Sequence, residues 1–224
     1  MKCTDLLNSC DLSDFLNQEE KNLIINNSTV AKYKKGEILI KQGERVTDAF
    51  FICSGYVKVF LEFKRRNLIL NIWGPNKFIL LGQMISSDQQ PFNVTAIEET
   101  TVSLIDIAVL REFAQKDSRL ALHLFKIFND SITYYINHNL VSLTQNNIHG
   151  RLANIILYLA EVVFKSTSFD MLLSRKELSE LCNISRENVI KVLYEFNSDG
   201  IIQLNGKSIN IMSLENLRRI ANHG

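Results

Sequence analysis

The chain has 224 residues, of which 46% are hydrophobic and 22% charged, and its formal net charge is +1. This length suffices for one large or two modest domains, and the composition is typical of a globular protein. No apolar run approaches the roughly 20 residues that a membrane-spanning helix needs, and the acidic N-terminus lacks the apolar core of a signal peptide. We therefore expect a cytoplasmic protein without membrane association, and the charge balance alone gives no sign of nucleic-acid binding.

The first half of the chain predicts two short helices followed by many short strands. Residues 12–16 and 19–25 are amphipathic, and from residue 30 the apolar pattern changes to the period of strands. Short antiparallel strands separated by turn glycines indicate a small β-roll, similar to a jelly roll. The predicted strands cover residues 30–33, 37–40, 49–52, 56–60, 68–73, 92–96 and 101–105.

A long helix is expected over residues 118–144. Apolar residues and asparagines recur there in steps of three and four, which is the heptad pattern of a coiled coil. A single amphipathic helix on its own core is the alternative, but a length of roughly 40 Å favours a two-fold homodimer. Polar residues 145–147 then predict a hinge. The seam positions are Leu122, Phe125, Asn129, Ile132, Ile136, Asn139 and Leu143.

The C-terminal part predicts two capped helices and a hairpin. Ser174 and Glu177 have the spacing of a capping box, Ser185 is a second N-cap, and Gly200 follows the second helix. Residues 201–204 and 208–211 flank a turn of the Asn-Gly kind, which predicts a β-hairpin. This order is typical of a winged helix-turn-helix, although many helix pairs are only packing units. Further helices are expected at 150–164 and 215–221.

Polar residues at the start of the second helix favour DNA binding. A recognition helix presents its first turns to base edges in the major groove. Arg186 and Lys191 can pair with guanine, and Glu187 can accept from cytosine, so these three are the predicted base-reading residues. Ser185 and Asn188, at the helix start, suit phosphate oxygens.

The run from Ser185 to Lys191, Ser-Arg-Glu-Asn-Val-Ile-Lys, resembles the recognition helix of the CRP/FNR family of bacterial transcription regulators. Residues 35–37, 42–44 and 51–59 are similar to that family's cyclic-nucleotide-binding β-roll, and the likeness extends from about residue 30 to residue 211. It implies an α+β chain with a sensor domain at 1–115, a dimerisation helix and hinge at 116–147, and a winged helix-turn-helix at 148–224. It also implies that Arg175 contacts phosphate and that RNA polymerase is a partner. Ser174 and Lys207 complete the expected phosphate contacts.

The expected effector pocket departs from the family pattern. Members that bind cyclic AMP hold its ribose with a Gly-Glu pair and its phosphate with an arginine, whereas this chain has no arginine between residues 67 and 110. Because burying an unpaired phosphate would cost several kcal/mol, we expect cyclic AMP not to bind tightly and the effector to be another small molecule. The family pattern places the pocket at Gly82, Gln83, Phe92, Asn93, Ile136 and Asn137.

The cysteines and histidines predict no metal site. An iron–sulfur cluster needs about four thiolates at workable spacing, and these side chains are dispersed. A haem ligand among the first three histidines stays open, since some family members sense gases through haem. The alternative function is therefore a haem- or small-ligand-binding sensor whose helix-turn-helix contacts proteins, and no catalytic arrangement is found. The four cysteines are Cys3, Cys10, Cys53 and Cys182, and the four histidines are His123, His138, His149 and His223.

Overall fold

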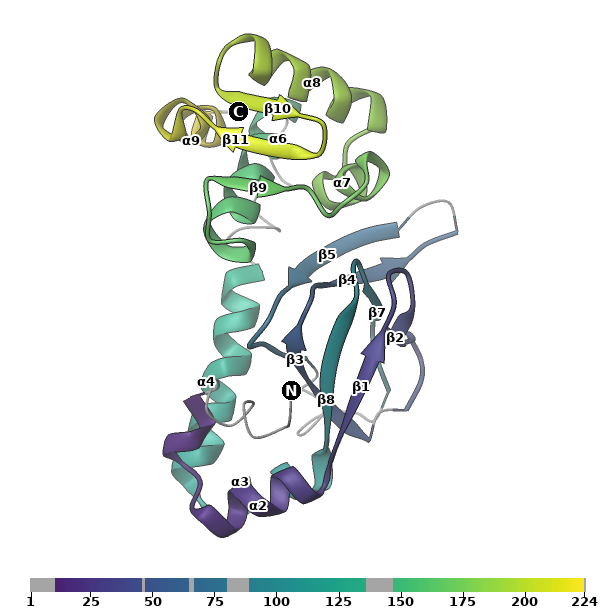
Figure 1. Cartoon of the computed structure of the whole chain (residues 1–224), viewed down its shortest axis with the longest axis vertical. Helices are drawn as coiled ribbons and strands as arrows, with labels where there is room; N and C mark the ends of the chain where they lie inside the picture. The colour runs from purple at the N-terminus through teal and green to yellow at the C-terminus, as the bar shows by residue number, and fades with distance from the viewer. Residues whose placement is uncertain (1–10, 46, 65–66, 80–88, 136–146, 224) are drawn as a thin grey trace. The chain divides into compact units, whose positions relative to one another are not determined.

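The computed structural model describes residues 11–45, 47–64, 67–79, 89–135 and 147–223 (Figure 1). The chain divides into two compact units: unit 1 comprises residues 1–61 and 73–132, and unit 2 comprises residues 62–72 and 133–224. None of the described helices is long and apolar enough to cross a membrane. Helices combined with antiparallel sheets confirm the predicted α+β class.

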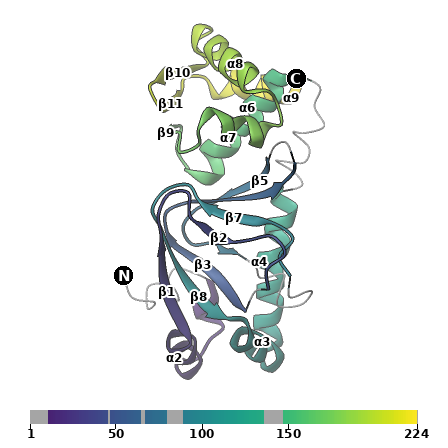
Figure 2. The same ribbon diagram turned by 90° about the vertical axis from the view of Figure 1, so that its right-hand side faces the viewer.

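Two four-stranded antiparallel sheets form the β-roll (Figure 2). The first has the order β1-β8-β3-β6, with β1 (Ser28–Tyr33), β8 (Thr100–Asp106), β3 (Asp48–Ser54) and β6 (Phe78–Ile79). The second has the order β2-β7-β4-β5, with β2 (Ile38–Ile40), β7 (Asn93–Ala96), β4 (Val57–Glu62) and β5 (Asn67–Trp73). The predicted strands are confirmed. The two-residue strand β6 is absent from the prediction because it is too short to show a period.

The tight turn between β3 and β4 requires a glycine. Gly55 has a φ of +83°, and a side chain there would bring its Cβ within 2.5 Å of the Glu99 carbonyl oxygen. Both the backbone angle and the lack of space therefore restrict this position to glycine. The turn sets β4 beside β7, where Val57 pairs with Ala96 and Val59 with Val94.

Helices cover the first sheet of unit 1 and share its apolar core. They are η1 (Asp11–Asp14), α2 (Gln18–Asn26), α3 (Ile107–Lys116) and α4 (Ser118–Tyr135). Ile24, Phe113 and Leu124 are buried in one cluster with Phe51 of β3. α3 is absent from the sequence prediction. The long helix is confirmed as far as Tyr135, and residues 136–144 of that prediction lie outside the described residues.

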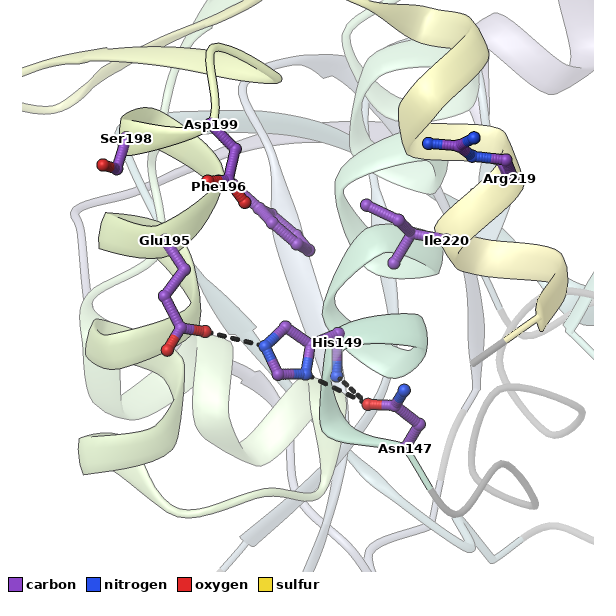
Figure 3. A pocket seen from close by; sticks show the side chains of 8 residues that line it. All are labelled: Asn147, His149, Glu195, Phe196, Ser198, Asp199, Arg219 and Ile220. Atoms are coloured by element: carbon purple, nitrogen blue, oxygen red, sulfur yellow. Dashed lines mark hydrogen bonds and ion pairs between the residues drawn. The ribbon is translucent and has the colours of Figure 1, made fainter.

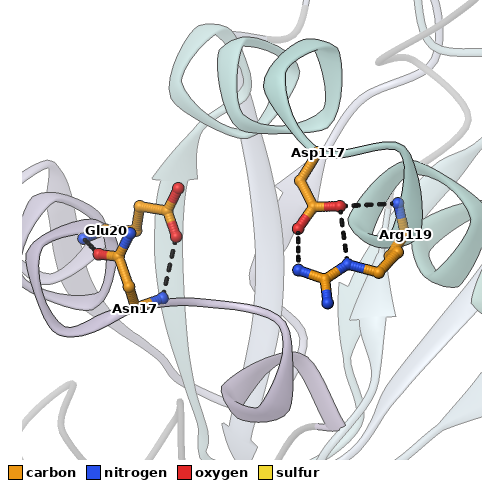
Figure 4. Close-up of polar contacts among 4 residues, drawn as sticks. All are labelled: Asn17, Glu20, Asp117 and Arg119. Atoms are coloured by element: carbon orange, nitrogen blue, oxygen red, sulfur yellow. Dashed lines mark hydrogen bonds and ion pairs between the residues drawn. The ribbon is translucent and has the colours of Figure 1, made fainter.

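Side chains satisfy free backbone amides at the starts of two of these helices (Figure 4). Asn17 Oδ1 accepts from the Glu20 N–H at 2.9 Å, and the Glu20 carboxylate accepts from the Asn17 N–H at 2.9 Å. Before α4, the Asp117 carboxylate accepts from the backbone N–H of Arg119 and from its guanidinium, both at 2.8 Å. Such caps fix where each helix begins.

The substitution Asp117→Asn should flatten the fall of stability at acid pH. The side-chain bond from Arg119 is the largest cause that lowers the pKa of Asp117 from 3.8 to about 2. A carboxyl with a lowered pKa stabilises the fold above its unfolded pKa, and this contribution is lost as pH falls through about 2. Thermal unfolding followed from about pH 5 to pH 2 should show a shallower decline than wild type. Glu44→Gln, at an exposed carboxyl, is the control, and equal slopes in wild type and Asp117→Asn would contradict the prediction.

Unit 2 contains a winged helix-turn-helix (Figure 1). α6 (Ile148–Tyr158) continues into the π-helical turn η4 (Leu159–Val163), α7 (Arg175–Cys182) and α8 (Arg186–Ser198) form the helix-turn-helix, and α9 (Leu214–His223) follows. The wing is a sheet of order β10-β11-β9, with β10 (Ile202–Asn205), β11 (Ser208–Ile211) and β9 (Ser168–Asp170). The predicted helices and hairpin are confirmed, and β9 is an addition.

Two details of unit 2 differ from the sequence prediction. The α-helical part of α6 ends at Tyr158 instead of reaching residue 164, because the Phe164 N–H bonds to the Leu159 carbonyl five residues back. In the wing, Asn205 pairs with Ser208, so the loop consists of Gly206 and Lys207 and is one residue shorter than the predicted loop of residues 205–207. Gly206 has a φ of 60° at the first loop position, where a two-residue hairpin loop prefers glycine.

Candidate DNA-binding surface

Two serine caps and one left-handed asparagine shape the helix-turn-helix. Ser174 Oγ accepts from the Glu177 N–H at 3.2 Å, and Ser185 Oγ accepts from the Asn188 N–H at 3.2 Å, which confirms both predicted N-caps. Between the helices, Asn183 has a φ of 54°, a conformation that asparagine tolerates better than most residues. Arg151 of α6 donates to the Asn183 carbonyl oxygen at 3.2 Å and so holds the turn.

The buried face of α8 decides which of its side chains are exposed. Val189, Leu193 and Phe196 are at most 2% exposed and pack into the core of unit 2. The predicted base-reading residues lie on the exposed part of this helix: Arg186, Glu187 and Lys191. Of the predicted phosphate contacts, Ser174, Ser185 and Lys207 are exposed, and Arg175 and Asn188 are half-buried.

The charges of this surface are set by short-range contacts. The backbone N–H of Glu187 is the largest cause that lowers the pKa of its carboxyl, and the Ser185 hydroxyl acts in the same direction. Glu187 is therefore an ionised acceptor over the usual pH range. Partial burial lowers the pKa of Arg175, and Tyr194 acts in the opposite direction. Lys191 Nζ lies 3.8 Å from Glu195 Oε1 on the same helix.

Tyr194 is a surface residue that the sequence reasoning missed. Its side chain is 69% exposed, although it is a large aromatic residue on α8. It follows Lys191 by three residues and Glu187 by seven, so the three side chains share one helix face. Its exposure could have been predicted, because Tyr194 does not fall on the helix face formed by the buried residues Val189, Leu193 and Phe196.

An open hollow of about 700 Å³ lies between α6, α8 and α9 (Figure 3). On its wall, His149 Nε2 is 2.7 Å from Glu195 Oε2, and His149 Nδ1 is 3.1 Å from Asn147 Oδ1. Asn147 Oδ1 also accepts from the His149 backbone N–H at 2.9 Å, which caps α6. These contacts join the first turn of α6 to the recognition helix.

The other candidate metal and haem ligands are placed as follows. The His123 ring stacks on Phe15 with 4.4 Å between ring centroids. Cys182 is buried, which raises the pKa of its thiol, and Cys53 is half-buried in β3. No group of three or more His, Cys, Asp or Glu side chains among the described residues could hold a metal ion. Cys3, Cys10 and His138 lie outside the described residues.

Only two of the predicted effector-pocket residues lie in the described part of the chain. Phe92 is half-buried, and Asn93 is 3% exposed, with its Oδ1 accepting from the Gln42 N–H at 3.0 Å. Asn93 Nδ2 and both side-chain amide atoms of Gln90 are buried without a hydrogen-bond partner among the described residues. The other four, Gly82, Gln83, Ile136 and Asn137, lie outside the described residues.

The helix α4 has two apolar faces. Leu120 and Leu124 are 2% and 5% exposed and belong to the core of unit 1. The predicted seam lies elsewhere on the helix, where Leu122 is 69%, Phe125 55% and Ile132 42% exposed, and Asn129 is exposed beside them. Exposed apolar side chains at this spacing are typical of a helix that packs on a partner. The remaining seam positions, Ile136, Asn139 and Leu143, lie outside the described residues.

Comparison with known protein families identifies both parts of the chain. Residues 30–117 match the family model of the cyclic nucleotide-binding domain, and residues 150–220 match that of the Crp-like helix-turn-helix domain. The chain is 29% identical over 198 residues to a CRP-like cAMP-activated global transcriptional regulator of Mycobacterium tuberculosis, a match that covers 84% of this chain and 86% of that protein. It is 24% identical over 184 residues to the transcriptional activator protein Anr of Pseudomonas aeruginosa, covering 80% and 75%.

Solved structures share the fold. FixK2 from Bradyrhizobium japonicum superposes with a TM-score of 0.79 at 18% identity, covering 86% of this chain and 96% of that one. A CooA mutant from Carboxydothermus hydrogenoformans superposes with a TM-score of 0.75 at 19% identity, covering 94% and 95%. At such identities the likeness concerns the fold alone.

Proposed function

Because this chain belongs to the CRP/FNR family of transcription regulators, we propose that it binds a pseudo-palindromic DNA site as a homodimer. We also propose that a small molecule other than cyclic AMP controls it. The observation that carries the DNA-binding role is the exposure of Arg186, Glu187 and Lys191 on the first two turns of a capped recognition helix. These side chain types match the base edges that the major groove presents.

A dimer places two recognition helices on one face of the duplex. The half-site centres should then lie about 34 Å apart, one helical turn of DNA. Each half-site should contain a G·C pair read by Arg186 or Glu187. Lys191 would add a point charge, which reads guanine less rigidly than a guanidinium fork. We further propose the domain limits 1–115, 116–147 and 148–224, and RNA polymerase as a partner.

Selection of duplexes from a random library by the purified protein tests this function. A pseudo-palindrome should emerge, and its affinity should fall with rising salt because phosphate contacts release counterions. The alternative, a haem- or small-ligand-binding sensor whose helix-turn-helix contacts proteins, predicts no salt-dependent DNA binding. An absorbance spectrum of the purified protein tests whether this sensor binds haem.

Lys207→Ala should weaken binding to all DNA sequences to a similar degree. Lys207 is exposed in the two-residue wing loop, where its ammonium can reach a phosphate but where no base contact is proposed. Removing one phosphate contact should reduce the salt slope, log affinity against log salt, by about 1. Lys165→Ala, at an exposed lysine outside the helix-turn-helix and wing, is the control. A change in sequence preference would show that Lys207 reads bases.

Cyclic AMP should not bind with a dissociation constant in the micromolar range or below. The segment from residue 67 to residue 110 contains no arginine to hold a cyclic phosphate, and the side chains of Gln90 and Asn93, which are buried there, are neutral amides. A neutral amide balances a phosphate charge less well than a guanidinium does. Isothermal titration of the full chain with cyclic AMP measures this directly. We expect this result although the mycobacterial relative is named cAMP-activated. A micromolar dissociation constant would contradict the proposal.

A further inference from the structure

The hydroxyl of Tyr158 is buried against β5. The side chain of Tyr158 is 2% exposed, and those of Asn71 and Ile72 are 6% and 3% exposed. The Ile72 N–H donates to the Tyr158 oxygen at 2.9 Å, and the hydroxyl lies within donating distance of the Ile72 carbonyl oxygen, at 3.0 Å, and of Asn71 Oδ1. Residues 62–72 belong to the same compact unit as Tyr158. We call this set of bonds the Tyr158 contact.

The Tyr158 contact satisfies backbone groups that the sheet leaves open. β5 is the last strand in the order β2-β7-β4-β5, so one row of its N–H and C=O groups has no neighbouring strand among those that the structure describes. A hydroxyl offers one donor and two acceptor lone pairs, and here it engages both backbone groups of Ile72. Asparagine is depleted in strands, yet the buried Asn71 accepts from the Ile72 N–H at 2.9 Å as well. Burial raises the pKa of Tyr158, so the hydroxyl keeps its proton.

α6, which ends at Tyr158, is also bonded to the other helices of the winged helix-turn-helix. Leu159, the next residue, begins a π-helical turn, a rare feature that is frequent at functional sites. The same helix is hydrogen-bonded to the turn before α8, to α8 itself and to α9. These bonds are Arg151 to the Asn183 carbonyl at 3.2 Å, His149 to Glu195 at 2.7 Å, and Asn154 to the Ala221 carbonyl at 3.3 Å.

We propose that Tyr158 is a positioning residue that fixes β5 to α6 and thereby orients the recognition helix for binding two half-sites at once. This inference rests on the proposed function. Two recognition helices gain from acting together only while their separation matches the site, since a loosely held second helix has a low effective concentration at its half-site. Rigid attachment also reduces the entropy lost on binding. Tyr158 itself reads no base.

The first test measures amide hydrogen exchange in the full-length protein. Tyr158→Phe keeps the ring and removes the hydroxyl, and Asn71→Leu keeps a side chain of similar size without the acceptor. Each should raise exchange of peptides covering residues 67–73 by about tenfold or more, and the double variant should add little because both changes break one contact. Tyr33→Phe, at a half-buried tyrosine of β1, should change nothing there. Unchanged exchange in Tyr158→Phe would overturn the proposal.

The second test compares duplexes with one and two half-sites, taken from the sequence that wild type selects. Relative to wild type, the affinity of Tyr158→Phe for the duplex with two half-sites should fall by about tenfold or more. Its affinity for the duplex with one half-site should stay within about twofold of wild type. Equal losses on both duplexes would overturn the positioning role. If Tyr158→Phe does not fold, as circular dichroism would show, Asn71→Leu takes its place. If wild type selects no duplex, the proposed function fails, and the exchange result alone decides whether Tyr158 holds β5.

Discussion

Arg186→Ala should lower the affinity for the selected duplex by about 5- to 150-fold, or about 1–3 kcal/mol. Arg186 is the first residue of α8 and is exposed beside the Ser185 cap. From that position its guanidinium can make the two parallel bonds to guanine that a planar fork allows. Fluorescence anisotropy with a labelled duplex at one fixed salt concentration measures the loss.

A second set of duplexes separates base reading from general charge. Replacing the guanine that Arg186 reads should weaken wild type but have little further effect on Arg186→Ala, because the two changes remove the same contact. Arg219→Ala is the matched control, since Arg219 is an exposed arginine on α9, outside the helix-turn-helix. Unchanged specific affinity of Arg186→Ala would show that Arg186 has no base-reading role.

Leu122→Glu should convert a dimer into monomers and weaken binding to the two-half-site duplex by about 10²- to 10⁴-fold. Leu122 is 69% exposed on α4, one turn from Phe125, at 55%. In a two-fold seam each copy would place its new carboxylate in an apolar contact beside that of its partner, which is strongly unfavourable. Light scattering should give about half the wild-type mass, and affinity for a single half-site should stay within about twofold.

Leu23→Glu serves as the matched control for this change. Leu23 is also an exposed leucine, at 48%, but it lies on α2 outside the predicted seam. It should leave the mass and the DNA affinity as in wild type. A dimeric Leu122→Glu protein would contradict the seam, and monomeric wild type would contradict the homodimer as well.

The recognition motif was predictable because its determinants are local. Ser174 and Glu177 are hydrogen-bonded to each other three residues apart, as are Ser185 and Asn188. A few consecutive residues therefore determine where each helix begins. The helical spacing of Val189, Leu193 and Phe196 likewise gives the buried face of α8 without knowledge of its neighbours. The exposure of Arg186, Glu187 and Lys191 follows from that spacing.

Other features were not predictable because their partners are distant in sequence. Arg151 bonds to a carbonyl 32 residues away, and Tyr158 to a strand 86 residues away. Nothing in the local pattern distinguishes Tyr158 from a tyrosine that only fills the core of unit 2. The wing loop is one residue shorter than predicted, because Asn205 pairs with Ser208 and so belongs to β10.

By itself, the sequence determined that this chain combines a β-roll, a long helix and a winged helix-turn-helix, because caps, turns and periods act over a few residues. It also determined which side chains begin the recognition helix. Only the tertiary structure decided that β5 joins the unit of α6 and that a buried tyrosine holds it there. Hydrogen bonds between distant segments depend on how whole elements pack, and no local propensity encodes that packing.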